Sequence, residues 1–302
     1  MLVHGLPYGV DPTDSAPRVA LLQSTQPHEH INMEFLMRLT HLIAAAVMAT
    51  APLAVFAKDE ALAKAVADPH RTPALVERDK FRHPQEELEF FGIRPDMTVV
   101  EIAPGGGYWT EILAPYLREK GTLYTAITPR SANERAAQSY DRWKKKLEDN
   151  AAVYGKVKIS ELGAGTFNPA PDGSADAVLT FRNVHNWMGG GVADQVFASF
   201  YKALKPGGIL GVEEHRAAND KPQDPKAQSG YVREDYTIAL AEKAGFKYVG
   251  KSEILANPKD TKDWPKGVWT LPPSLALGDQ DRDKSLAIGE ADNFVLKFVK
   301  PK

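Results

Sequence analysis

One segment in the first half of the chain passes from a buried strand through a glycine-rich turn into a helix. Residues 97–104 (MTVVEIAP) are an almost continuous apolar run with one acid, Glu101, near its end, which is typical of a strand buried on both faces of a sheet. Three consecutive glycines follow at 105–107, and residues 108–117 (YWTEILAPYL) repeat apolar side chains at the spacing of a helix. This segment requires helices packed against a sheet, which excludes all-helical and all-β folds.

The alternation of strands and helices continues over the rest of the chain. It predicts a single doubly wound, Rossmann-like α/β domain whose sheet is mostly parallel, with helices on both faces. Residues 257–290, rich in Pro, Asp, Lys and Trp, are predicted to be an insertion before the last strand. The predicted strands are 97–104, 121–128, 156–162, a segment within 171–187, 209–215, 246–255 and 293–301; the predicted helices are 59–67, 85–91, 108–117, 131–149, 192–204 and 231–244.

The first 57 residues differ from the rest of the chain. Residues 1–32 show no helical or strand period and are interpreted as an upstream extension or a disordered segment. Residues 33–57 have the anatomy of a secretory signal peptide, because Arg38 precedes an uncharged run that ends before the small residue Ala57. The domain itself is therefore expected to span residues 58–302.

The signal peptide indicates where the protein works. Met33 or Met37 is expected to be the true start, and cleavage near Ala57 would release a periplasmic or secreted protein without a stable membrane anchor. The uncharged run of 15 residues (42–56) is short for a membrane span, which needs about 20 residues. Two alternatives stay open, namely an amphipathic or buried N-terminal helix and an uncleaved membrane anchor.

Composition excludes several classes of protein. The chain has no cysteine, so disulfide scaffolds, thiolate nucleophiles and cysteine-ligated zinc sites are excluded. Its 37 basic and 39 acidic residues give a net charge of -2, which lacks the basic excess that drives nucleic-acid binding, so no nucleic-acid partner is expected. Hydrophobic residues make up 43% of the chain and charged residues 25%, as in an ordinary globular protein rather than a disordered one.

The glycine turn lies where ligands bind in sheets of this kind, at the carboxyl end of a central strand. Glycines there let the backbone approach a ligand closely, and the following helix presents free N–H groups. A dinucleotide fingerprint starting at Gly105 needs Gly or Ala at position 110, where Thr110 stands, and no acid follows the second strand until Glu134. A nicotinamide dinucleotide is therefore disfavoured, and a turn without any ligand is the remaining alternative.

Three segments in order resemble the class I S-adenosylmethionine-dependent methyltransferases. Residues 101–107 (EIAPGGG) resemble that family's first motif, with Glu101, Gly105 and Gly107 matching and Ala103 replacing its first glycine. Residues 171–180 (PDGSADAVLT) and 204–210 (LKPGGIL) resemble the entries to its fourth and fifth strands. The nearest likeness is to the uncharacterised exported "predicted methyltransferase" group, which carries similar EIAPGGGYWTEIL and FRNVHNW segments.

This resemblance implies a seven-stranded sheet with an antiparallel last strand, and S-adenosylmethionine as cofactor. It implies that the glycines cradle the methionine part of the cofactor and that Glu101 supports the loop or a nearby amine. Thr128 stands where the family usually has an acid for the ribose hydroxyls, and Glu161 is expected to compensate from the third strand. The expected cofactor residues are Glu101, Ala103, Gly105, Gly106, Gly107, Thr128, Glu161 and Asn183.

The segment RNVHNW (182–187) follows the fourth strand at the mouth of this site, where the family carries substrate-facing side chains. His185 is the expected base, because histidine titrates nearest neutral pH. The expected catalytic residues are His185, Asn183 and His215. No metal is expected, because the sequence has no close ligand spacing such as H-x-x-x-H; a two-histidine, one-carboxylate site at His185 and His215 stays an alternative.

Two functions are compatible with these patterns. The first is methyl transfer from S-adenosylmethionine to a small-molecule or protein acceptor, by in-line displacement that depends mainly on positioning. The second is an exported, non-catalytic protein that binds a small molecule on a methyltransferase fold. The glycine turn and the histidine segment favour the first function, and the missing acid after the second strand favours the second.

Overall fold

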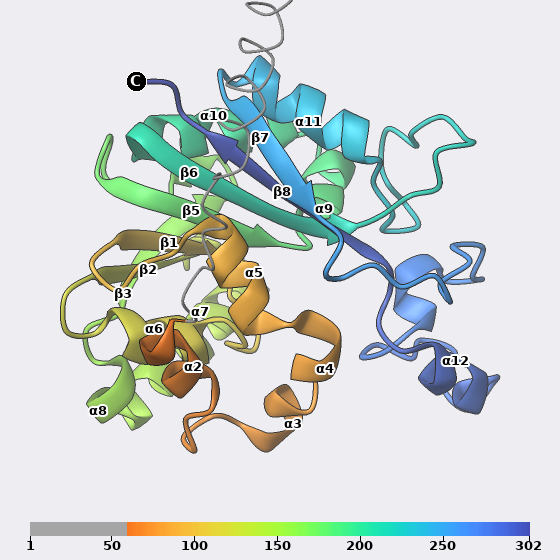
Figure 1. Cartoon of the computed structure of the whole chain (residues 1–302), viewed down its shortest axis with the longest axis horizontal. Helices are drawn as coiled ribbons and strands as arrows, with labels where there is room; N and C mark the ends of the chain where they lie inside the picture. The colour runs from red at the N-terminus through yellow and green to blue at the C-terminus, as the bar shows by residue number, and fades with distance from the viewer. Residues whose placement is uncertain (1–58) are drawn as a thin grey trace, which may run out of the picture. The chain divides into compact units, whose positions relative to one another are not determined.

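Strand β1 (Thr98–Ile102) lies near the middle of an eight-stranded sheet, with side chains buried on both faces. The structure is a computed structural model that describes residues 59–302, so the expectations for residues 1–57 lie outside the described residues. The strand order is β4-β3-β2-β1-β5-β6-β8-β7 (Figure 1). The other strands are β2 (Thr122–Ile127), β3 (Lys158–Gly163), β4 (Thr166–Asn168), β5 (Ala175–Phe181), β6 (Leu204–His215), β7 (Lys247–Ser252) and β8 (Asn293–Val299).

The strand directions confirm the mostly parallel α/β sheet. Strands β3, β2, β1, β5 and β6 pair in parallel, and β8 runs antiparallel between β6 and β7. The count of seven strands is corrected to eight, because β4 forms an antiparallel hairpin with β3 inside a segment predicted to be a loop. Residues 163–165 make that turn with positive φ values of 118°, 50° and 86°, which two glycines allow.

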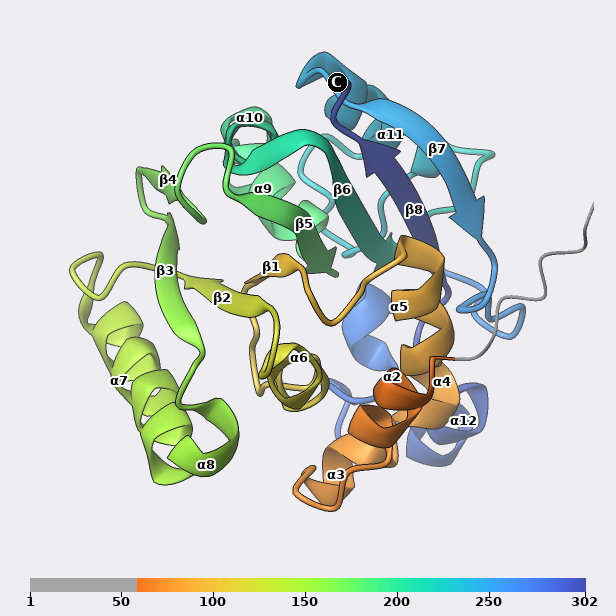
Figure 2. The same cartoon turned by 60° about the vertical axis from the view of Figure 1, so that its left-hand side comes forward.

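Helices cover both faces of the sheet (Figure 2). The alternating side chains of β1 explain this, since Val99 packs into one apolar core and Val100 into the other. The predicted helices are found as α2 (Glu60–Val66), α5 (Pro84–Phe91), α6 (Thr110–Leu117), α7 (Glu134–Asp149), α10 (Ala193–Ala203) and α11 (Glu234–Lys243). The sequence did not predict the short elements α3 (Pro73–Val76), α4 (Asp79–Arg82), α8 (Ala151–Tyr154), α9 (Val184–Gly189), η1 (Gly267–Thr270) and α12 (Arg282–Ile288).

The insertion at 257–290 is folded around a buried carboxylate. Asp260 accepts hydrogen bonds from the Tyr231 hydroxyl at 2.8 Å, from Trp264 Nε1 at 2.7 Å and from the backbone N–H of Asp292 at 2.8 Å. These contacts tie the start of the insertion to Tyr231 and to Asp292, the residue before β8. Within residues 59–302, no helix is long and apolar enough to cross a membrane.

Candidate functional site

The turn between β1 and α6 has the backbone that its glycines were expected to provide. Gly105 and Gly107 have φ values of 58° and 94°, in the left-handed region that glycine adopts without strain. Ala103 also has a positive φ of 50°, which is uncommon for a residue with a Cβ atom and is typical of a functional site. The turn thus bends sharply and exposes its backbone at the carboxyl end of β1.

Glu101, in the last part of β1, connects the two ends of this turn. Its side chain is buried and its Oε2 accepts a hydrogen bond of 2.5 Å from the hydroxyl of Thr110, the first residue of α6. Burial raises the pKa of Glu101 to about 8, with Thr110 partly opposing the shift. The carboxyl group is therefore mostly protonated at neutral pH and ties the strand end to the helix start.

The turn forms one wall of a cavity of about 520 Å³, here called the loop cavity. Five of the expected cofactor residues line it: Ala103, Gly105, Gly106, Thr128 and Asn183. Glu161 and Gly107 do not line it, and Glu101 lines a neighbouring cavity instead. The remaining lining residues of the loop cavity are Pro104, Ile127, Ser139, Tyr140, Arg142, Trp143 and Lys146.

Helix α7 forms the opposite wall and packs closely on the turn. A Cβ atom at Gly107 would lie 2.9 Å from Lys146 Cε, so this glycine is needed for the approach of the helix. Lys146 Nζ donates to the carbonyl of Gly106 at 3.1 Å and to Glu111 Oε1 at 2.8 Å. The ammonium group of Lys146 therefore links α7 to the turn and to the start of α6.

The segment after β5 is fixed by hydrogen bonds and by an unusual backbone. Asn183 Nδ2 donates to the Thr180 hydroxyl and to the Phe181 carbonyl, both at 3.2 Å, which holds its side chain at the wall of the loop cavity. Arg182 has a positive φ of 62°. A non-glycine residue in that region costs free energy, and such strain concentrates at ligand sites.

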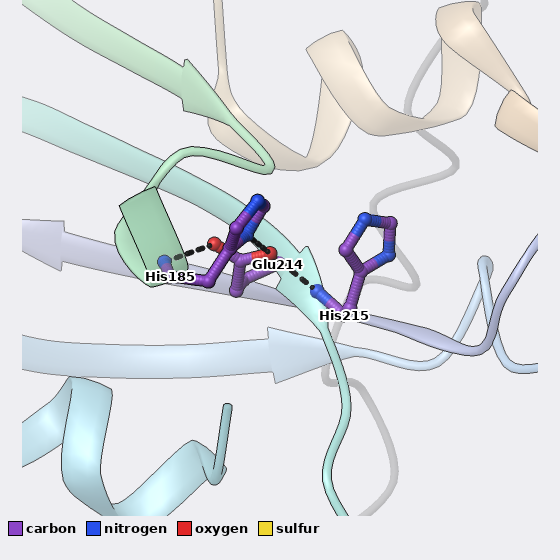
Figure 3. A group of neighbouring side chains, drawn as sticks. All are labelled: His185, Glu214 and His215. Atoms are coloured by element: carbon purple, nitrogen blue, oxygen red, sulfur yellow. Dashed lines mark hydrogen bonds and ion pairs between the residues drawn. The ribbon is translucent and has the colours of Figure 1, made fainter. Parts of the chain in front are cut away.

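A second cavity of about 290 Å³ lies beside His185 and His215 and is here called the imidazole cavity. His185 belongs to the first turn of α9, and its Nδ1 contacts Glu214 Oε1 at 3.0 Å. His215 ends β6, and its Nδ1 contacts Asn293 Oδ1 at 2.7 Å. Figure 3 shows the two rings on either side of Glu214. The structure thus brings together two of the three expected catalytic residues in one cavity.

The charges around this cavity favour a neutral His215 and an ionised Glu214. Burial lowers the pKa of His215 to about 4, with Glu214 partly opposing the shift. The pKa of Glu214 is lowered although burial alone would raise it, because the charge and the hydrogen bond of His185, together with the backbone N–H of His215, favour the carboxylate. Burial raises the pKa of Glu213, the residue before Glu214 in β6, to about 7.

A small cavity of about 150 Å³, here called the bridging cavity, lies between the other two. It shares residues 103–106 with the loop cavity and shares Arg78, Phe181 and Arg182 with the imidazole cavity. The bridging cavity therefore has one wall in common with each of the other two cavities, and all three lie along the carboxyl ends of β1, β5 and β6, where doubly wound sheets bind ligands.

The sequence did not reveal the arginines of this region. Arg78, Arg82 and Arg182 all donate to Glu290, at 2.6, 3.3 and 3.0 Å for their nearest pairs of atoms. These residues come from segments more than 100 positions apart, so no local pattern signals their meeting. The positive φ at Arg182 is a structural signal that becomes visible only in the folded chain.

Three aromatic residues near the glycine turn and in α9 pack against other side chains. Trp109 is buried and stacks on Phe181 with ring centroids 4.2 Å apart. Tyr108 is also buried, and its hydroxyl donates to Asp79 at 2.7 Å. Trp187 packs on Phe200, with centroids 5.5 Å apart. None of the three lines the loop cavity.

The part of the chain that contains the glycine turn is similar to a known protein family. Residues 100–212, from β1 to the middle of β6, match a family model described as "Methyltransferase domain". Residues 100–212 are therefore similar to a methyltransferase domain. The match begins in the strand that leads into the glycine turn and includes every residue that lines the loop cavity, but only four of the residues that line the imidazole cavity, Phe181, Arg182, His185 and Asn186.

Several solved structures that are similar to this chain are described as methyltransferases. A SAM-dependent methyltransferase from Aquifex aeolicus has a TM-score of 0.48 and 16% identity, over 74% of this chain and 93% of that one. An arsenic(III) S-adenosylmethionine methyltransferase from Chlamydomonas reinhardtii has a TM-score of 0.42 and 18% identity, over 80% and 73%. Phosphoethanolamine N-methyltransferase 2 from Haemonchus contortus has a TM-score of 0.45 and 16% identity, over 74% and 53%. A search of curated protein sequences found no match.

The loop cavity fits S-adenosylmethionine, the cofactor that the sequence resemblance implies. Its volume of about 520 Å³ lies within the range of about 300–1,000 Å³ common for ligand pockets. A Cβ atom at Gly106 would meet no atom within 4 Å, so the wall beside the turn is open to a ligand. Thr128 lines the cavity at the end of β2 and offers a hydroxyl where the family usually has a carboxylate.

Proposed function

We propose that the protein is a methyltransferase that binds S-adenosylmethionine in the loop cavity and a methyl acceptor in the imidazole cavity. The observation that supports this most is the bridging cavity, which shares lining residues with both the loop cavity and the imidazole cavity, since a donor and an acceptor must lie next to each other for in-line displacement. When bound, S-adenosylmethionine supplies the methyl group, and its sulfur keeps the electron pair of the broken bond.

The chain's own residues orient the acceptor and take its proton. Glu214 is ionised and can only accept hydrogen bonds, so His185 Nδ1 donates to it, and in the neutral tautomer of His185 the lone pair is on Nε2. A histidine whose tautomer is fixed by a carboxylate is suited to act as a general base. We assign the proton transfer from the acceptor to His185 Nε2; Asn183, two residues before it, lines the loop cavity.

The acceptor is proposed to be a small molecule or a single side chain of a protein. An imidazole cavity of about 290 Å³ has room for a compact group only. Arg78 and Arg182 on its wall are paired with Glu290, which leaves the histidines as the groups that contact a neutral acceptor. Neither the family match nor this geometry favours the non-catalytic alternative.

The place of action is proposed from the sequence alone. Residues 33–57 have the order of a signal peptide, and the domain holds no cysteine that an oxidising compartment would affect. The protein is therefore proposed to act in the periplasm or outside the cell, where S-adenosylmethionine would have to be supplied.

Calorimetric titration with S-adenosylmethionine and S-adenosylhomocysteine tests this function. Gly105→Val is expected to raise the dissociation constant at least 100-fold, because a β-branched residue is strained at a φ of 58° and its side chain faces the loop cavity. Gly250→Val in β7 is the matched control, since a Cβ atom there meets nothing within 4 Å. His185→Ala should leave the binding of both ligands unchanged. No binding of either ligand at millimolar concentration would refute the proposal.

A further inference from the structure

Two histidines and a glutamate from adjacent strands of the sheet meet at the wall of the imidazole cavity. His185 follows β5, and Glu214 and His215 end β6, its parallel neighbour. Each residue offers one ligand atom, and these atoms all lie within 4.8 Å of one another (Figure 3). Within residues 59–302, no other group of three or more histidine, aspartate or glutamate side chains brings its ligand atoms this close together.

The distances are close to those that a metal ion requires. Two ligands of one tetrahedral ion, each about 2.1 Å from it, stand about 3.4 Å apart. His185 Nδ1 and Glu214 Oε1 are already 3.0 Å apart. The third ligand atom therefore needs to move by roughly 1.4 Å at most, which a side-chain rotation at the end of a strand can supply.

His215 is prepared for ligation by its neighbours. Asn293 Oδ1, at 2.7 Å from His215 Nδ1, can only accept, so Nδ1 carries the N–H and the lone pair for a metal ion is on Nε2. Asn293 is held in this orientation because its Nδ2 donates to Glu213 Oε1 at 3.0 Å. Histidines that bind metals commonly donate their other ring N–H to such a carbonyl or carboxylate, which fixes the ring and raises the basicity of the ligand.

Glu214 supplies a buried negative charge at the centre of the group. It has no exposed surface, and the backbone N–H groups of His185 and His215 donate to its two oxygens at 3.1 and 2.8 Å. A buried carboxylate without a cation beside it is costly, and the guanidinium group of Arg182, which lines the same cavity, is paired with Glu213 and Glu290. A divalent ion would neutralise Glu214 in place.

The cavity leaves room for further ligands. Both histidines line the imidazole cavity of about 290 Å³ together with Trp269 and Asn186, so a water molecule or a substrate atom can reach an ion held there. Catalytic metal sites typically combine three protein ligands with one such open position, whereas structural sites are closed by four. Two imidazoles and one carboxylate suit zinc, cobalt or iron rather than magnesium or calcium.

We infer that His185, Glu214 and His215 form a site for a divalent transition-metal ion that binds the methyl acceptor through a hydroxyl or thiol group. The acceptor role rests on the proposed methyltransferase function; the metal site itself does not. On binding the ion, the acceptor's O–H or S–H bond breaks, its proton leaves to the solvent, and the oxygen or sulfur keeps the electron pair that faces the ion. With the ion bound, His185 is a ligand rather than the base.

Titration of the chelator-treated, full-length protein with Co²⁺ alone tests the site. The visible absorption of Co²⁺ with four or five ligands should appear and saturate, and Zn²⁺ should displace it. The signal should be lost in His185→Gln and in His215→Gln, with the dissociation constant raised at least 100-fold. Since His4, His28 and His30 add imidazoles in the leader, the quantity compared is the difference between wild type and variant.

His70→Gln is the matched control, because His70 pairs with Asp68 on a different cavity and should keep the full signal. Chemical modification of the wild-type histidines by diethyl pyrocarbonate gives a second readout that needs no variant. Zn²⁺ should protect His185 and His215 and leave His83 modified. No saturable Co²⁺ signal, an unchanged signal in both cluster variants, or no protection by Zn²⁺ would overturn the inference.

Titration with S-adenosylmethionine separates this inference from the proposed function. Each variant is also titrated with the cofactor, whose cavity does not include His185, Glu214 or His215. If the metal binds and the cofactor does not, the metal site stands and the methyltransferase proposal falls. If the cofactor binds and the metal does not, the metal site falls and His185 keeps its role as the base.

Discussion

At the scale of single residues, Glu101 shows how burial changes the chemistry of the glycine turn. Burial raises its pKa to about 8, from the value of 4.5 that is usual for a glutamate in water. A raised pKa means that the folded state binds a proton more tightly than the unfolded state. Glu101 therefore contributes stability that is fully present below pH 4.5 and is lost as the pH rises towards 8.

Glu101→Gln tests this directly. Glutamine keeps the acceptor for the Thr110 hydroxyl but cannot ionise, so between pH 5 and 8 the free energy of unfolding of the wild type should fall relative to the variant. The limiting slope is about 1.4 kcal/mol per pH unit. Urea unfolding at pH 5, 6.5 and 8 measures the difference. Parallel pH dependences of wild type and variant would show that Glu101 is ionised when folded.

The site residues that could be predicted from the sequence are those that directly follow the carboxyl end of one strand, β1. Gly105, Gly106 and Ala103 line the loop cavity because any strand-to-helix turn at the middle of such a sheet lies there. Glu161 was expected in the same cavity but lies on β3 paired with Asn168 of β4. The sequence contained no signal for that hairpin, because the three residues of β4 are too few to show a period.

At the scale of elements, the long periodic segments were predicted and the short ones were not. The strand 97–104 and the helix 131–149 are found as β1 and α7, shortened by a few residues at their ends. Helix α9 was missed because its six residues, VHNWMG, are too few to show a helical period. They also end in a glycine, which is unfavourable inside a helix. Its position is set by Glu214, which accepts from the N–H of His185. Tertiary contacts thus place the element that carries the central histidine.

Strand β6 packs so closely on α5 that one methyl group should disturb it. A Cβ atom at Gly211 would lie 2.8 Å from Leu179 Cδ2 and 2.9 Å from Phe91 Cδ1, both in a fully buried layer. Gly211→Ala is expected to lower the free energy of unfolding by about 1–3 kcal/mol, as overpacking of a core does. Urea unfolding monitored by tryptophan fluorescence measures it.

Gly250→Ala is the control for this prediction. Gly250 lies in β7 at the edge of the sheet, and a Cβ atom there meets nothing within 4 Å. The variant should match the wild type to within about 0.5 kcal/mol, as substitutions outside the core usually do. Equal losses in both variants would mean that strand propensity, and not the contact with α5, determines the effect.

At the scale of the whole molecule, an ion cluster joins parts of the chain that the sequence keeps far apart. Glu290, next to the last strand, accepts from Arg78 and Arg82 near the start of the domain and from Arg182 in the middle. The alternation of strands and helices predicted a single domain but not these ion pairs between distant segments, because charged residues follow no period that identifies their partners. The cluster also forms the wall that the bridging and imidazole cavities share.

Removal of the central charge should therefore weaken the whole fold. Glu290→Gln keeps the shape of the side chain but leaves three guanidinium groups, of which Arg82 is nearly fully buried, without their carboxylate. Breaking a buried ion pair from one side costs about 3–5 kcal/mol, so the free energy of unfolding should fall by about 3 kcal/mol. Asp194→Asn, which removes an exposed ion pair with Lys243, should change it by less than about 1 kcal/mol. Urea unfolding of both variants measures these differences in the free energy of unfolding. Similar small decreases in both variants would mean that the arginines contact solvent or Glu213 instead, and that the cluster does not hold the segments together.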